Sequence, residues 1–443
     1  MTPARGGLLL SLVFFICAIA CSGVLPLWLD EILQLLETRD TSPTQMLTVL
    51  ARNPGAAPLG YLVQQATLRI GGYSVRRARL PMAFFASGSV LLVVLLAIEV
   101  GVRPWLAGVL FAAFPLTFRY ATEARGYSQA LFLSLLATLI YVRAAKRPAW
   151  GIAAVYCLVL CAAIYTQPFT ASVGMAHVLW SFLQRDKAFA WRDSAPFKWM
   201  GAAALAAAVV LFLPWYFWSK ETWAAGIGPN ALHFSATLKT PLMLFRELAG
   251  AGYWGSGLLA ILCVIAIVSG QPSQGMQRLL ILLIAIPIAA GFTADAVFNY
   301  FIAARQFLWV LPAVALLAAG AAQKYPRIGL VLTTGFCVIG IMQSVKYFTA
   351  PHEDFQLAAR LLRQESQQGA CVAVAPKELS RLYEFFEPGL ATEPCDLARL
   401  VLAATPYTTE KEQTVATDEI TGRGYQKERQ EQSGGSTLVF FHR

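Results

Sequence analysis

The chain has 443 residues, of which 57% are hydrophobic and only 14% are charged, and its mean hydropathy is +0.56. Soluble domains average about 45–50% apolar and about 25% charged residues, so this composition excludes an ordinary soluble protein. The formal net charge of +10 comes without a dense Lys/Arg tract, because many basic residues lie in short segments between apolar runs. We attribute the charge to membrane topology and expect no nucleic-acid partner.

Apolar runs long enough to cross a bilayer, which takes about 20 residues, follow one another along most of the chain. The first run starts like a signal peptide, but it extends from Leu8 to Trp28, so we predict an uncleaved first helix. In all we predict about eleven membrane-spanning helices, near residues 8–27, 80–100, 104–119, 127–143, 149–165, 168–184, 199–218, 253–269, 278–295, 305–322 and 327–346.

Basic residues cluster in three segments between these runs. Counting helices places all three segments on one side, which the positive-inside rule makes cytoplasmic. The clusters are Arg143, Lys146 and Arg147; Arg185, Lys187, Arg192 and Lys198; and Lys324 and Arg327. The N-terminus is then cytoplasmic, and the outer segments are 28–79, 120–126, 219–252, 296–304 and everything after residue 347.

The composition changes after Tyr347, which predicts two domains. Residues 1–347 form an all-α membrane-spanning domain with a first outer loop at 28–79, and residues 348–443 form a small extracytoplasmic α/β domain. Within the second domain, periodicity predicts helices at 353–368 and 377–386 and strands at 370–375 and 437–441. Residues 408–436 are polar, and we expect them to be partly disordered.

Two of the eight cysteines, Cys371 and Cys395, lie in this polar region, whereas the other six lie in apolar runs. In an extracytoplasmic domain a disulfide between them would close a loop of about 25 residues and stabilise it by about 3 kcal/mol. The alternative is two unrelated thiols.

An acidic pair, Asp30-Glu31, comes directly after the first spanning helix, beside Trp28. Carboxylates at this depth are costly unless they are used or paired, which favours a functional role. They are equally compatible with charges at a helix N-terminus, where a negative charge is favourable in any case.

Three further segments follow the acidic pair in the first 130 or so residues: Pro58-Leu59-Gly60-Tyr61, Arg79-Leu80-Pro81 and Glu123-Ala124-Arg125-Gly126-Tyr127. Together the four features resemble the GT-C class of polyprenyl-phosphate-sugar-dependent glycosyltransferases, which includes protein O-mannosyltransferases and the bacterial aminoarabinose transferase of lipid A. One departure is Asn53 before Pro54, where many relatives have His.

The resemblance implies an inverting transferase of a hexose or pentose, with its active site on the extracytoplasmic side and Asp30 as general base. A positioned base contributes about 10²–10⁴-fold. Arginine suits the leaving phosphate because its planar fork binds phosphate oxygens bidentately. The outer candidates are Arg79, Arg125 and Arg305, with Lys220 and Lys239 as weaker choices; each is also compatible with snorkelling to lipid head groups.

Further site residues follow from the same resemblance. Glu123 is the second carboxylate: it either joins Asp30 or Glu31 in holding a divalent metal or pairs with Arg125. We expect Tyr61, Tyr127 and Gln167 to contact substrate, whereas His177 and His233 read as packing or loop residues. No closely spaced carboxylate cluster indicates a metal loop, so metal dependence stays open.

The sequence lacks the GxGxxG, GxxxxGK[ST], HExxH and GxSxG motifs, which favours a lipid-linked donor over a sugar nucleotide. The acceptor is a lipid, glycan or protein, and we expect a bacterial inner membrane location. The main alternative is a transporter or lipid flippase, which would place ionisable residues near the bilayer midplane in repeated halves. A polysaccharide ligase or polymerase, or an inactive relative, are further alternatives.

Overall fold

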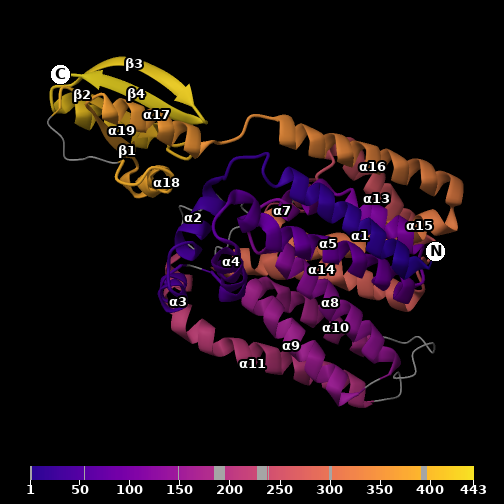
Figure 1. Ribbon diagram of the computed structural model, residues 1–443. Coiled ribbons are helices and arrows are strands. Elements are labelled where there is room, and N and C mark those ends of the chain that lie inside the picture. The colour runs from indigo at the N-terminus through magenta and orange to yellow at the C-terminus, as the bar shows by residue number, and fades with distance from the viewer. Residues whose placement is uncertain are drawn as a thin grey trace. The chain divides into compact units, whose positions relative to one another are not determined.

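The computed structural model describes residues 2–53, 55–147, 149–183, 195–226, 237, 239–298, 302–390 and 397–443 (Figure 1). Its contacts divide the chain into two compact units. Unit 1 comprises Met1–Ser22 and Glu37–Phe348, and unit 2 comprises Gly23–Leu36 and Thr349–Arg443. Each unit has its own hydrophobic core.

Unit 1 is helical, and its longest helices are the apolar ones. In the described part of the chain, seven helical segments are long and apolar enough to cross a membrane. They are α1 (Pro3–Cys21), α5 (Val75–Val100), α8 (Tyr127–Lys146), α11 (Ala195–Gly226), α14 (Gln274–Phe298), η3 (Ala304–Val310) continuing into α15 (Leu311–Lys324), and α16 (Pro326–Thr349). An eighth span results if α12 (Thr240–Ala249) and α13 (Gly252–Val268), which meet at 97°, count as one.

Each of the eleven predicted spans coincides with an apolar helix, but the count of eleven spans is not confirmed. The region predicted at 104–119 is divided into α6 (Pro104–Ala112) and α7 (Pro115–Ala121). Two others are short: α9 (Trp150–Thr166) and α10 (Ala171–Leu183), which follows the 3₁₀ turn η1 (Pro168–Thr170). Prolines at the starts of α6, α7 and η1 contribute to these breaks, because proline has no N–H to continue a preceding helix.

The break between α6 and α7 is packed against the last helix of unit 1. A side chain at Gly340 of α16 would place its Cβ 2.3 Å from the carbonyl oxygen of Ala113, so only glycine allows this approach. The rings of Phe114 and Phe336 meet edge to face nearby, with centroids 5.0 Å apart. α16 therefore runs alongside the start of the segment that carries Glu123.

The segment predicted as the first outer loop is largely helical. It contains α2 (Leu29–Thr38), α3 (Pro43–Leu50) and α4 (Pro58–Gly71). Ser42 and Gln45 form a reciprocal capping box at the start of α3, which satisfies two otherwise free backbone donors. Pro58 occupies the first turn of α4, where a missing N–H costs nothing.

Unit 2 contains a four-stranded sheet in the order β1-β2-β4-β3. β1 (Ala370–Ala375) pairs parallel with β2 (Arg399–Ala404), and β4 (Ser436–His442) pairs antiparallel with β2 and with β3 (Gln426–Ser433). The helices are α17 (Phe355–Gln367), α18 (Ser380–Glu384), preceded by the 3₁₀ turn η4 (Lys377–Leu379), and α19 (Glu410–Gly422). Three predictions for this region are confirmed: the helix at 353–368 corresponds to α17, the strand at 370–375 to β1, and the strand at 437–441 to β4.

The expectation of disorder at 408–436 was wrong, since this region forms α19 and β3. Thr409 and Glu412 form a capping box that starts α19, and Ile420 anchors the helix in the core of unit 2. β3 is polar because it is an edge strand whose side chains are almost all exposed, while its backbone pairs with the buried β4. Low hydrophobicity here reflects an exposed position rather than an absence of structure.

Candidate active site

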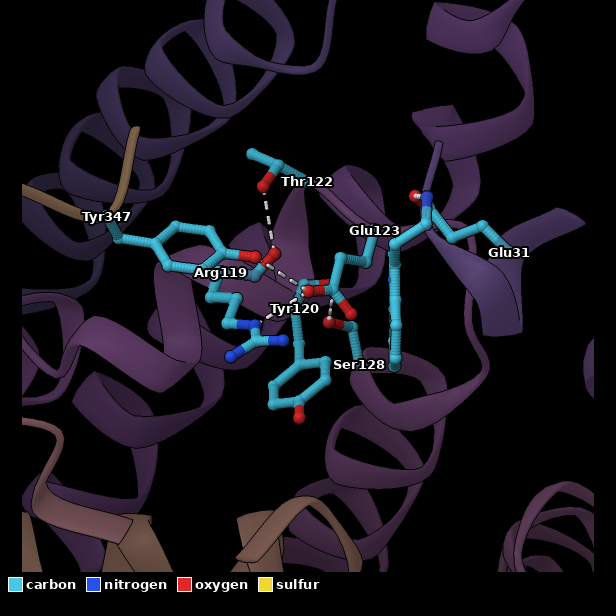
Figure 2. A network of polar contacts seen from close by, with 8 residues as sticks. Glu31, Arg119, Tyr120, Thr122, Glu123, Ser128 and Tyr347 are labelled. Atoms are coloured by element: carbon cyan, nitrogen blue, oxygen red, sulfur yellow. Dashed lines mark hydrogen bonds and ion pairs between the residues drawn. The ribbon is translucent and has the colours of Figure 1, made fainter. Parts of the chain in front are cut away.

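The centre of the candidate site in unit 1 is Glu123, in the turn between α7 and α8 (Figure 2). Only 3% of this residue is exposed. Arg119 lies four residues earlier, and its Nε donates to Glu123 Oε1 at 2.7 Å. The i,i+4 spacing places both side chains on one face, and the burial of the carboxylate makes the pair stronger than a surface ion pair.

A residue far away in the sequence completes this contact. The Tyr347 hydroxyl, near the end of α16, donates to the same Glu123 Oε1 at 3.3 Å. The Arg119 guanidinium lies over the Tyr347 ring, 4.7 Å from its centroid, and 5.6 Å from the centroid of the Tyr120 ring. Figure 2 shows the carboxylate, the guanidinium and the two rings together. Aromatic faces stabilise a partly desolvated cation, so the arginine is held as well as the carboxylate.

Hydrogen bonds to the backbone fix the turn that carries Glu123. The Thr122 hydroxyl donates to the Arg119 carbonyl and the Ser128 hydroxyl donates to the Tyr120 carbonyl, both at 2.8 Å. The buried Gln64 of α4 donates from Nε2 to the Ala124 carbonyl at 3.2 Å. The turn is therefore held both by its own side chains and by α4.

Arg125, on the other side of this turn, lies beside Tyr61 of α4. Burial raises the pKa of Tyr61 to about 12, Arg125 acts to lower it, and Glu37 and Tyr127 add to the increase. The Arg125 guanidinium is 5.7 Å from the centroid of the Tyr127 ring. Three residues predicted from the sequence, Tyr61, Arg125 and Tyr127, thus lie together, and Glu37 joins them.

The two groups of residues are connected through aromatic rings. Tyr120 and Tyr127 meet edge to face with centroids 5.1 Å apart. Burial raises the pKa of Tyr120, Glu123 adds to the increase, and Arg119 and Arg305 oppose it. Arg305 is the second residue of η3, and its positive charge therefore acts on the same cluster.

Gln167 lies near this cluster because it follows Thr166, whose side chain is next to Gly60 and Gly126. A Cβ added to Gly60 would lie 3.5 Å from Gly126 Cα and 4.0 Å from Thr166 Cγ2, which are ordinary van der Waals distances, so these three residues are neighbours. The Gln167 backbone ends α9 by donating to the Ala163 carbonyl at 2.8 Å, and its carbonyl accepts from the Thr170 N–H at 3.0 Å. The break between α9 and η1 thus faces the starts of α4 and α8.

Arg79 has a different environment from the other two predicted arginines. It is 2% exposed, and its Nη1 donates to the carbonyl of Ser22, just after the end of α1, at 2.8 Å. A guanidinium that satisfies the last carbonyls of a helix has a structural role. This contact ties α5 to the end of α1.

Asp30 and Glu31 belong to unit 2, where they form the first turn of α2. The Glu31 N–H donates to the Trp28 carbonyl at 3.0 Å, and the Trp28 N–H donates to Glu31 Oε2 at 3.5 Å. Glu31 is 0% exposed, whereas Asp30 is half-buried. Glu31 therefore supports the start of the helix, and both charges lie at its positive end.

The remaining predicted residues lie elsewhere. Lys220 is exposed on α11, 5.8 Å from the centroid of the Phe217 ring, and Lys239 directly precedes α12. Cys371 of β1 is disulfide-bonded. Its predicted partner Cys395, like His233, lies outside the described residues, so that pairing stays a prediction.

The sequence leaves open whether the protein binds a divalent metal. Within the part of the chain that the structure describes, no group of three or more His, Cys, Asp or Glu side chains is arranged to hold a metal ion.

Several residues of the cluster were not predicted as site residues: Arg119, Tyr120, Glu37, Gln64 and Tyr347. The spacing of Arg119 and Glu123 carried a usable signal, because residues four apart on a helix are neighbours. Tyr347 had no such signal, since it is 224 residues from Glu123.

The apolar helices and the fold define a polytopic membrane protein with an ArnT-like architecture. The chain is similar to ArnT from Cupriavidus metallidurans in the apo state, with 11% identity and a TM-score of 0.62 over 99% of this chain and 98% of that chain. It is also similar to ArnT from the same organism bound to undecaprenyl phosphate, with 11% identity and a TM-score of 0.58 over 98% and 97% of the two chains.

The likeness is one of fold. No protein-family model matches the chain, and no curated protein matches it. The structural similarity nevertheless extends over nearly the whole of both proteins, so it includes the small C-terminal sheet as well as the helices.

Proposed function

We propose that this protein is a glycosyltransferase that moves a sugar from a polyprenyl-phosphate donor to an acceptor hydroxyl on the extracytoplasmic side of the membrane. The observation that carries the proposal is the buried, charged Arg119–Glu123 cluster in the turn between α7 and α8 of an ArnT-like fold. A buried ion pair is weak evidence for stability, and ionisable groups in membrane proteins commonly mark function. That one ArnT structure is bound to undecaprenyl phosphate supports a donor of this chemical class.

In the proposed reaction Asp30 is the general base. It takes the proton of the acceptor hydroxyl as that oxygen forms a bond to the anomeric carbon of the sugar. The bond from the anomeric carbon to the phosphate oxygen breaks on the opposite face, so the configuration inverts. The products are the glycosylated acceptor, a protonated Asp30 and the polyprenyl phosphate, whose charge is stabilised by cations of the site.

Arg125 and Arg305 are the proposed phosphate-binding residues. Both act on the tyrosine cluster next to Glu123, Arg125 at Tyr61 and Arg305 at Tyr120. Arg79 remains a third candidate: its Nη1 donates to the carbonyl at the end of α1, and a guanidinium carries five N–H donors in all. Tyr61, Tyr127 and Gln167 are proposed to contact the sugar, since tyrosine and glutamine donate and accept hydrogen bonds without reacting.

The proposed location is the inner membrane of a bacterium, with a cytoplasmic N-terminus. The disulfide at Cys371 supports an extracytoplasmic C-terminal region, because disulfides persist in oxidising compartments and are rare in the cytosol. The basic residues Arg143 and Lys146, which pair with Glu99 at 2.9 and 2.5 Å, then lie on the cytoplasmic side.

The test is reconstitution of the full chain in liposomes with a labelled undecaprenyl-phosphate sugar and a crude envelope fraction as acceptor. The proposal predicts that label passes to a new glycoside, which mass spectrometry identifies. Movement of the lipid across the bilayer without any new glycosidic bond would contradict the proposal and support a flippase. Comparison of envelope glycans with and without the protein then names the sugar and the acceptor.

A further inference from the structure

The end of α16 is tied to the segment that carries Glu123 by two consecutive residues. Phe348 packs edge to face on Phe118 of α7, with centroids 5.6 Å apart, and Phe118 packs in the same way on Phe14 of α1 at 5.5 Å. Three helices far apart in the sequence therefore meet at this point. The apolar contacts hold the end of α16 beside Arg119, the next residue of α7.

Tyr347 makes the polar part of this contact. Its hydroxyl and the Arg119 Nε both donate to Oε1 of Glu123, at 3.3 and 2.7 Å, and its ring lies against the Arg119 guanidinium. Two donors on one carboxylate oxygen fix the orientation of the carboxylate, because a rotation of the side chain breaks both bonds. Figure 2 shows the hydroxyl and the guanidinium approaching the carboxylate from two different helices.

The position of Tyr347 along the chain is also informative. α16 ends at Thr349, where the second segment of unit 2 begins. Tyr347 is thus two residues before the chain enters unit 2, at the point where the last helix of unit 1 ends. A displacement of the end of α16 would remove the hydroxyl from Glu123 directly.

We propose that Tyr347 and Arg119 are positioning residues: they hold Glu123 in its reactive orientation, and they do so only while the end of α16 is docked on α7. This inference rests on the proposed function, because the role that it assigns to Glu123 is a role in sugar transfer. Tyr347 and Arg119 act through Glu123 and need not touch the substrate.

The test is a double-mutant cycle on the full chain, with Tyr347→Phe, Glu123→Gln and the double variant. Tyr347→Phe keeps the ring on Arg119 and removes only the hydroxyl. We expect it to lower kcat about tenfold, as for loss of one hydrogen bond to a charged group, with little change in the KM for the donor. In the Glu123→Gln background the same substitution should cause less than a twofold further loss.

An equal tenfold loss in both backgrounds would overturn the proposal, because Tyr347 would then act independently of Glu123. Tyr325→Phe is the matched control, since Tyr325 is an exposed tyrosine just before the start of α16. It should leave kcat and KM unchanged.

A second measurement does not depend on activity. The melting temperatures of the same four proteins in detergent should be non-additive, because the hydroxyl and the carboxylate interact directly. If the wild-type protein transfers no sugar, the proposed function fails, and additive melting shifts would then overturn the Tyr347–Glu123 contact as well. Non-additive shifts with an inactive wild type would support the Tyr347–Glu123 contact and contradict only its role in sugar transfer.

Discussion

Unit 1 contains two buried polar clusters of opposite character, one centred on His177 and the other on Glu123. His177 of α10 is hydrogen-bonded through Nδ1 to the Tyr156 hydroxyl and through Nε2 to the Thr138 hydroxyl, both at 3.0 Å. The Thr138 hydroxyl already donates to the Ser134 carbonyl at 2.8 Å. Nε2 must therefore carry the proton, and Nδ1 accepts from Tyr156, so a single neutral tautomer satisfies both contacts.

The Glu123 cluster cannot be neutral in the same way, because its arginine is charged at any accessible pH. Neutral hydrogen bonds between helices hold a membrane protein together at modest cost. A buried charge is expensive to keep, so its retention points to chemistry. The neutral polar residues join α8, α9 and α10, whereas the charged ones are those that we propose take part in a reaction.

The largest expected difference between the two clusters is the loss of sugar transfer when Glu123 is replaced. Glu123→Gln keeps the shape and removes the charge, and we expect transfer to fall by about 10²–10³-fold, the usual loss for one preorganised electrostatic group. The melting temperature should also fall, because the substitution removes the carboxylate charge that pairs with Arg119 and weakens the hydrogen bond from Tyr347. Initial rates with the labelled donor measure the loss, and a variant with more than half of the wild-type rate would remove Glu123 from the site.

A smaller effect is expected at Arg125. Arg125→Lys keeps the charge but loses the planar fork, so the KM for the donor should rise by about 10–100-fold. Arg76→Lys, at an exposed arginine at the start of α5, is the matched control and should not change the KM. Equal KM values for the two variants would remove Arg125 from the phosphate site.

The smallest effect is expected in the neutral cluster. Thr138→Val leaves the His177 Nε2–H without its acceptor and should lower the free energy of unfolding by about 0.5–2 kcal/mol, with kcat unchanged. Thr333→Val on α16 is the control, since that hydroxyl donates to the carbonyls of Gly329 and Leu330 of its own helix. Unfolding in a graded detergent series measures both, and a loss of kcat in Thr138→Val would show that the neutral cluster also serves the reaction.

The sequence predicted the long apolar helices and two of the four strands, β1 and β4, because their signals are local, whereas β2 and β3 were not predicted. Apolar runs located every long helix of unit 1, and the run from Ala370 to Ala375 matches β1 residue for residue. Interruptions such as the one at Pro115 were harder to place, since α6 and α7 together are apolar enough to read as one span. The polar strand β3 was missed because its stability comes from pairing with β4.

The site was predicted in part for the same reason. Glu123, Arg125, Tyr61 and Tyr127 lie in short motifs, and Gly60 and Gly126 of these motifs are neighbours in the structure. Tyr347 joins them only through the packing of α16 on α7, which no local pattern encodes. The grouping of Gly23–Leu36 with the C-terminal segment likewise depends on contacts between distant parts of the chain.

The most direct test of the account is the rate of sugar transfer by Asp30→Asn. Asp40→Asn is the matched control, because Asp40 is an exposed carboxylate of the same segment that pairs with its neighbour Arg39 at 3.0 Å. The account predicts that Asp30→Asn lowers kcat by about 10²–10⁴-fold at normal expression while Asp40→Asn retains the wild-type rate. Full activity in Asp30→Asn would contradict Asp30 as the base and with it the proposed mechanism.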